Sequence, residues 1–118
     1  MTLDTSIYSL LGPLVGGECY PNKTGPNPAY PLIIYQGVGG VAIDFLDQSA
    51  APDDNARVQV IIWSRTKLEA SALAKQVRDV LLGSSMRVKT MAAAISMSNH
   101  LLDLYGSRQD FSIWYPRT

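Results

Sequence analysis

The sequence predicts an α+β fold in which one short and one long helix pack on a mainly antiparallel sheet. Apolar residues alternate with other residues at 57–63, which is typical of a strand with one buried face. Apolar residues then take a helical spacing at 67–82, which indicates a long helix directly after that strand. The apolar runs at 32–38 and 111–115 are short and rich in isoleucine or aromatic residues, as strands are.

A short helix is expected near the N-terminus. Three of its residues have the i, i+3, i+4 spacing of one buried face: Ile7, Leu10 and Leu11. Asp4 or Thr5 is the expected N-cap, and Gly12-Pro13 ends or bends the helix. Cys19-Tyr20 is interpreted as a brief edge strand.

The segment from residue 21 to residue 46 predicts a loop followed by two strands. Residues 21–31 contain four prolines and one glycine, which favours an extended loop. The strand at 32–38 ends among Gly37, Gly39 and Gly40, which indicate a bulge or a sharp bend. An extended pattern resumes at 41–46. The sequence therefore predicts a strand, a bend and a second strand.

The alternating strand has one wholly apolar face, formed by Val58, Val60 and Ile62. This face should meet the core. The opposite face is mixed and is expected to be partly covered by another element or by another subunit. It consists of Arg57, Gln59, Ile61 and Trp63.

The long helix begins with a capping box, in which Thr66 and Glu69 satisfy free backbone donors. It should run to about Leu82, with Gly83 just past the C-cap. Its apolar stripe is Ala70, Leu73, Ala74, Val77, Val80 and Leu81.

Residues 86–97 are ambiguous. The alanines at 92–94 favour a helix, but the stretch lacks the charges that solvate an exposed helix face. The flanking turn signals, GSS and SNH, favour a strand, and a strand that residues 101–105 extend is the preferred interpretation. The final strand, 111–115, places Trp114 on the face opposite to Phe111, Ile113 and Tyr115.

The composition excludes several classes of function. A chain of 118 residues predicts one domain, residues 1–118. The net charge of zero removes the broad attraction that nucleic acids or anionic membranes require. Cys19 is the only cysteine, so an internal disulfide and a zinc site of several thiolates are excluded. No secretory signal is visible, and no apolar run reaches the roughly 18 residues of a membrane helix. A reduced cytosolic setting is expected.

Candidate catalytic residues lack partners in the sequence pattern. His100 follows Ser98-Asn99 in a predicted turn, and Cys19 has no neighbouring cation to lower its pKa. The glycines at 37–40 lead into a strand pattern and not into a helix, so they do not form a phosphate-binding loop. We therefore expect a solvated histidine, a structural thiol and a bend in the sheet.

The densest set of carboxylates lies in the polar stretch at 47–55, DQSAAPDDN. Its spacing does not match a calcium loop, so a solvated acidic loop is expected, with a charged contact surface as the functional alternative. Arg65, Arg87 and Lys89 flank the ends of the long helix. They are interpreted either as ordinary surface charge or as the complement of that loop on another subunit.

The order of the segments is more specific than any one of them. It runs from IYSLLGPLVGGECYP through YPLIIYQGVGG and RVQVIIWSRTKLEASALAKQVRDVLLG to DLYGSRQDFSIWYP. This order resembles the tail completion proteins of long-tailed bacteriophages, also called tail terminator or head-to-tail joining proteins. The likeness covers nearly the whole chain and rests on hydrophobic patterns.

The resemblance implies a structural subunit that assembles as a ring, typically hexameric, on the end of the tail tube. The implied partners are other copies of the chain, the major tail tube protein and the head connector proteins, with the free protein either a ring or a monomer. No cofactor, metal or reaction is implied. The expected location is the tail–head junction of the virion, after synthesis in the host cytoplasm.

Two other functions stay open at the level of sequence. One is a small cytosolic ligand-binding protein or enzyme, and the other is a nucleic-acid-associated packaging factor, against which the neutral charge argues. A closed ring needs contacts between two different patches of one subunit. The candidate interface residues are Asp47, Asp53, Asp54, Arg57, Ile61, Trp63, Arg65, Arg87, Lys89 and Trp114.

Overall fold

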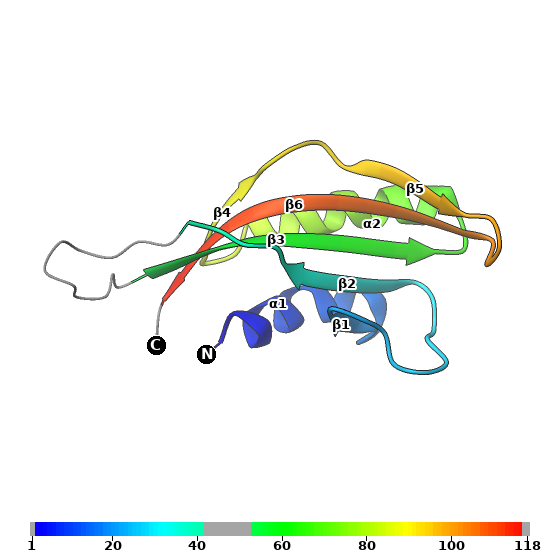
Figure 1. The fold of residues 1–118 in the computed structure, drawn as a ribbon, viewed down its shortest axis with the longest axis horizontal. Helices are drawn as coiled ribbons and strands as arrows, with labels where there is room; N and C mark the ends of the chain where they lie inside the picture. The colour runs from blue at the N-terminus through cyan, green and yellow to red at the C-terminus, as the bar shows by residue number, and fades with distance from the viewer. Residues whose placement is uncertain (1, 42–52, 117–118) are drawn as a thin grey trace, which may run out of the picture.

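The computed structural model describes residues 2–41 and 53–116, and Figure 1 shows their arrangement. The order of elements confirms the predicted α+β class, with two α-helices on a mainly antiparallel sheet. The elements are α1 (Leu3–Leu11), the 3-10 helix η1 (Gly12–Val15), β1 (Cys19–Pro21), β2 (Leu32–Gly37), β3 (Asp53–Ser64), α2 (Lys67–Leu82), β4 (Arg87–Thr90), β5 (Ile95–Asn99) and β6 (Leu104–Pro116).

The sheet is organised around two long central strands, β3 and β6. They pair antiparallel from Asp53↔Pro116 to Ser64↔Tyr105. On the far side of β3 follow β2, antiparallel, and then β1, which runs parallel to β2. On the far side of β6, β4 pairs with its C-terminal half and β5 with its N-terminal half. Figure 1 accordingly shows β1 and the β4–β5 edge at opposite sides of the sheet.

Both α-helices pack on the same face of the sheet. The predicted core face of β3 is confirmed, since Val58, Val60 and Ile62 are all buried in one cluster with Phe111 of β6. The helices contribute buried residues to the same cluster. These are Ile7 and Leu11 from α1, and Leu73, Val77 and Leu81 from α2. The stripe predicted for the long helix is therefore the face that meets the sheet.

The cap of the first helix differs from the prediction. Thr2, and neither Asp4 nor Thr5, is the N-cap of α1, because its backbone is extended and its hydroxyl accepts the backbone N–H of Thr5. The N-cap therefore lies two or three residues earlier than predicted. It continues past Gly12 as η1, so the expected bend at Gly12-Pro13 is a tightening into a 3-10 turn.

The start of α2 keeps only half of the predicted capping box. Thr66 is the N-cap, and its hydroxyl accepts the backbone N–H of Glu69. Glu69 does not reach back to the Thr66 N–H. Its carboxylate instead accepts the hydroxyl of the fully buried Ser64, whose oxygen accepts the Thr66 N–H. At the other end, Gly83 is itself the C-cap and donates to the carbonyl of Asp79.

The ambiguous stretch is strand, as preferred, but it is broken in two. Met91 donates its backbone N–H to Asp110, and Ile95 pairs with Arg108, so residues 92–94 lie opposite the single residue Gln109. The Gln109 side chain donates to the carbonyl of Ala92 and closes this wide bulge. The predicted extension at 101–105 is wrong, since residues 100–103 form the turn between β5 and β6.

The described part of the acidic stretch at 47–55 lies in a strand. Asp53, Asp54 and Asn55 are the first residues of β3, which corrects their assignment to a loop. They are held in the strand because the long β6 extends far enough to pair with them. Asp47 and the strand expected at 41–46 fall on residues 42–52, outside the described residues, apart from Val41, which is not in a strand.

The Ser64→Ala variant tests the hydrogen bonds at the connection between β3 and α2. Loss of the hydroxyl leaves the Glu69 carboxylate and the Thr66 N–H without their partner, so the free energy of unfolding should fall by about 1–3 kcal/mol. Urea unfolding monitored by circular dichroism measures this change. The exposed Ser9→Ala in α1 is the matched control and should change stability by less than about 0.5 kcal/mol. Equal effects of the two substitutions would contradict the assignment of Ser64.

Candidate assembly interface

No helix or strand among the described residues packs on the sheet face opposite the helices, and we call it the open face. The end of this face beside Trp63 is covered, since Leu32 and Leu104 are buried there. The pairing of β3 with β6 and β2 places Arg57, Gln59, Ile61 and Trp63 there. These are the residues of the mixed face that the sequence pattern singled out. None of the four is buried. Along β3 the polar half of this face, Arg57 and Gln59, and the apolar half, Ile61 and Trp63, lie at different ends. The neighbouring β6 adds Trp114 to the polar half and Arg108 to the apolar half.

The polar half is organised by Asp110, which the sequence did not single out. Its carboxylate lies 2.8 Å from Nη2 of Arg57 and accepts Nε of Arg57 at 2.9 Å and Nε2 of Gln59 at 3.3 Å. Arg57 is 48% exposed and Asp110 16%, so the pair is a surface contact that orients the arginine more than it stabilises the fold. Arg57 therefore already has an acidic partner within its own subunit.

The apolar half of the open face contains five partly or largely exposed side chains from three strands. They are Ile34 of β2, Ile61 and Trp63 of β3, and Ile95 and Met97 of β5. The sequence pattern identified only Ile61 and Trp63. Ile34 lies in the strand predicted at 32–38, but the run LIIY is apolar throughout and does not show which residues share a face. Ile95 and Met97 reach this face through their pairing with β6, which local patterns do not reveal.

Trp63 is held in place by a glycine on the neighbouring strand. A methyl group at Gly106 would lie 2.8 Å from Cε3 of Trp63 and 2.7 Å from the carbonyl oxygen of Ile62. The indole therefore lies against the bare backbone of β6, and only a residue without a side chain fits there. This contact fixes the position of the Trp63 ring on the open face.

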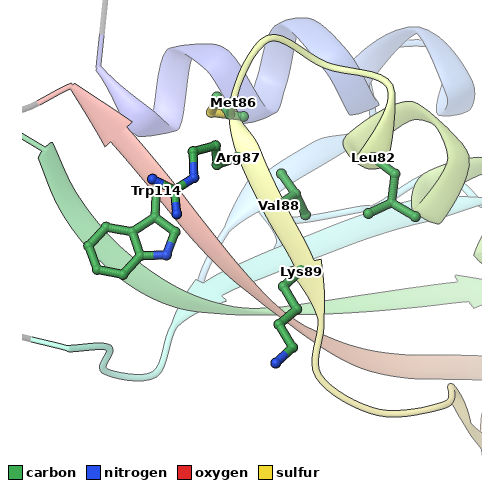
Figure 2. Close-up of a pocket in the computed structure, with 6 residues that line it drawn as sticks. All are labelled: Leu82, Met86, Arg87, Val88, Lys89 and Trp114. Atoms are coloured by element: carbon green, nitrogen blue, oxygen red, sulfur yellow. The ribbon is translucent and has the colours of Figure 1, made fainter.

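The basic candidates do not gather at one place. Arg87 and Lys89 lie on β4, opposite Trp114 and Ser112 of β6. Figure 2 shows Arg87 and Trp114 approaching each other from the two strands, and Cζ of Arg87 lies 5.6 Å from the ring centroid. A pocket of about 420 Å³ is lined by Arg87, Lys89 and Trp114 together with Leu82, Met86 and Val88.

Arg65 lies apart from the other two basic candidates. It follows the last residue of β3. Arg87 lies near the other end of that strand, because it pairs with Trp114, which in turn pairs with Asn55 of β3. Its guanidinium stacks over the ring of Tyr30 in the proline-rich loop, with Cζ 4.9 Å from the centroid. The three basic residues therefore do not form a single surface.

The singular residues of the sequence are not gathered into a reactive site. Cys19 is buried, and burial raises the pKa of its thiol to about 11. His100 is exposed in the turn before β6. In residues 2–41 and 53–116, no group of three or more histidine, cysteine, aspartate and glutamate side chains could hold a metal ion. No helix in the same residues is long and apolar enough to cross a membrane.

Burial also acts on Tyr35 of β2, which packs in the same cluster as Cys19. Burial, followed by the nearby Asp4 and Cys19, raises the pKa of its phenol to about 12. The hydroxyl of Tyr20 donates to Glu18, and this hydrogen bond raises the pKa of Tyr20. All three groups keep their protons at neutral pH, which favours a structural role over nucleophilic chemistry.

An α+β subunit whose exposed sheet face is partly apolar is typical of binding and assembly proteins. The comparison with protein families narrows this class. The model of the family described as tail completion protein gp17 matches residues 6–115, and the chain belongs to this family. The protein is therefore a structural component of bacteriophage tail assembly. No curated protein matches the chain.

The Gly106→Ala variant tests the packing of the Trp63 ring against Gly106. The added methyl group meets both the Ile62 carbonyl and the indole, so the free energy of unfolding should fall by about 1–3 kcal/mol. Urea unfolding followed by tryptophan fluorescence reports both the stability and the displacement of the ring. Gly37→Ala is the control, since a methyl group at that position would have no other atom within 4 Å. A Gly106→Ala variant as stable as this control would disprove the close packing.

The reactivity of Cys19 tests its burial. A rise of the pKa from 9.0 to about 11 lowers the fraction of thiolate at pH 8 by about 100-fold. The native protein should therefore react with a disulfide reagent at least about 100-fold more slowly than the urea-unfolded protein. Reaction rates measured spectroscopically from pH 7 to pH 10 should rise throughout this range in the native state. Equal native and unfolded rates would show that the thiol is accessible.

Proposed function

We propose that this chain caps the tail tube and joins the tail to the head connector as a closed, hexameric ring, with residues 1–118 forming a single domain. Membership of the tail completion family supports the place of action. The observation that supports the ring is the open face, on which five apolar side chains are partly or largely exposed at one end. Its partners would be neighbouring copies, the major tail tube protein and the head connector proteins.

The apolar half of the open face is the proposed centre of the contact between neighbouring subunits. Interfaces are strongest where aromatic and aliphatic side chains are removed from water around a fixed anchor. Trp63 is such an anchor, because Gly106 holds its ring against the sheet. Ile61 lies beside it on β3 and faces Ile34 on β2.

Charged residues at the other end of the sheet would set the orientation of the neighbour. Arg87 and Lys89 are exposed on β4, beside Trp114. The acidic side of this contact would come from Asp53 and Asp54 of another copy, with Asp47, which lies outside the described residues. Arg57 is less suited to this task because Asp110 engages it within the subunit. Charge pairs of this kind select the partner and its register more than they add affinity.

The Ile61→Glu variant tests the proposed ring contact. A carboxylate in this contact loses its hydration, and pairing with Arg108 on the neighbouring strand offsets only part of that cost. Ring assembly should therefore weaken by at least about tenfold in concentration. Mass photometry and negative-stain electron microscopy detect the rings, on the free protein or on purified tail tubes. Leu68→Glu, on the exposed surface of α2, is the control and should assemble as the unmodified chain does.

Two results would contradict the proposal. One is an unmodified chain that neither forms rings nor binds tail tubes. The other is an Ile61→Glu variant that assembles as well as the Leu68→Glu control while both remain folded by circular dichroism. The first result would argue against the capping function, and the second would argue only against the open face as the contact.

A further inference from the structure

The segment that follows β4 is unusual for an edge of a sheet. The residues from Thr90 to Leu102, TMAAAISMSNHLL, include no aspartate, glutamate, lysine or arginine. The one titratable side chain among them is His100. Four of its large apolar side chains are exposed, namely Met91, Ile95, Leu101 and Leu102. Natural proteins place lysine, proline or another block on an edge strand that must stay unpaired. The bulge at 92–94 interrupts the segment before β5, but β5 itself, Ile95–Asn99, contains no charged residue, no proline and no bulge. This composition indicates that the edge of β5 is used for pairing.

The backbone groups on this edge follow from the hydrogen bonds of β6. Met91 donates to the carbonyl of Asp110, so the even-numbered residues of β6 direct their backbone groups toward β4 and β5. Ile95 and Met97, which pair with even-numbered residues, bond inward. Ser96 and Ser98 therefore direct their N–H and C=O groups outward. Within residues 2–41 and 53–116, no strand pairs with that side of β5.

The opposite edge of the sheet is closed. Strand β1 contains Pro21, which has no N–H to donate, and its carbonyl accepts the backbone N–H of Lys23 at 2.7 Å. The N–H of Cys19 donates to Gly17 at 2.9 Å. Of the outer backbone groups of β1, the N–H is missing at Pro21, and the Cys19 N–H and the Pro21 carbonyl are occupied. One edge of the sheet is blocked against pairing, and the other presents free groups.

The surroundings of β5 specify the chemistry of a strand that would pair with it. A groove of about 220 Å³ lies between α2 and β5, and its walls are small side chains: Ala70, Ser71, Ala74, Ala94, Ser96 and Ser107. Lys67 and Lys75 also line it. Neither lysine forms an ion pair in the described part of the chain. The helix side of the groove is therefore basic, while the open-face side of β5 presents Ile95 and Met97.

We propose that β5 accepts an extended segment of another protein in which apolar and acidic residues alternate. The segment would pair with the outward backbone groups of Ser96 and Ser98. Its acidic side chains would face Lys67 and Lys75, and its apolar side chains would continue the strip formed by Ile95 and Met97. A second copy pairing β5 with β5 about a two-fold axis fits poorly, because it would bring the two lysine-bearing helices together on one face. The inference does not depend on the ring.

The test uses the purified chain and a nine-residue peptide in which valine and glutamate alternate. A matched peptide carries lysine in place of glutamate. In an NMR titration of the labelled protein, the glutamate peptide should shift the amide signals of residues 95–99. It should bind at least about tenfold more tightly than the lysine peptide at low salt.

Two variants separate the backbone and the charge contributions. Ser98→Pro removes an outward N–H and should weaken binding of the glutamate peptide by at least about tenfold, whereas Ser98→Val keeps the N–H and should bind normally. Lys67→Glu combined with Lys75→Glu should reverse the preference, so that the lysine peptide binds more tightly. This reversal does not depend on the fold of the proline variant.

Three results would overturn the proposal. The first is equal binding of the two peptides to the unmodified chain, including no binding of either. The second is an unchanged preference in the double lysine variant. The third is a dimer of the free chain that shields residues 95–99, seen by sedimentation and NMR, which would make a second copy the occupant.

Discussion

The long antiparallel pairing of β3 with β6 is the constraint on which the rest of the structure depends. All twelve residues of β3 pair with β6, and each strand also carries further strands on its outer side. The register decides which residues lie under the helices, such as Val58 with Phe111, and which lie on the open face, such as Arg57 with Ser112. A slip of one residue would exchange the two faces along the whole length of β3. The core and the candidate interface are therefore fixed by the same hydrogen bonds.

This arrangement separates stability from assembly. The helix-covered face contains the buried cluster, in which Phe111 and Ile113 are fully enclosed. The open face contributes little to that cluster, and its residues are free to differ in polarity along β3. At one end Asp110 neutralises Arg57 within the subunit, and at the other Gly106 holds Trp63 in place without enclosing it. Apolar surface can thus be kept for a partner while the isolated subunit stays folded.

Local patterns in the sequence predicted the parts of the fold that local forces determine. The alternation at 57–63 and the stripe and N-cap of α2 are found in the structure. The errors lie where distant residues decide. Asp53 and Asp54 belong to a strand because β6 is long enough to pair with them. At 92–94 three residues lie opposite Gln109, whose side chain bonds to Ala92, and a local pattern does not reveal this distant partner. The N-cap at Thr2 is a local feature, but its extended backbone precedes the apolar spacing that marked the helix.

The candidate site was predicted only in part for the same reason. Ile61, Trp63 and Trp114 were found from their place on the mixed face of a strand. Their companions Ile95, Met97 and Asp110 depend on which strands become neighbours, which no short window of sequence contains. The separation of Arg65 from Arg87 is likewise a consequence of the length of β3. The sequence therefore identified single residues of the candidate interface, whereas the pairing of strands determines which residues lie together on the open face.

The closure of β1 by Pro21 and Lys23 has a consequence for growth by strand addition. A sheet with two open edges can receive a strand on one side and offer its own on the other, so such sheets propagate. In this sheet most of the outer hydrogen-bonding groups of β1 are missing or used, while those of Ser96 and Ser98 on the other side face outward. Under the proposed pairing, a strand added at β5 would have no continuation through β1. The sheet would then be the last member of a series, because of Pro21 and the tight turns on either side of β1.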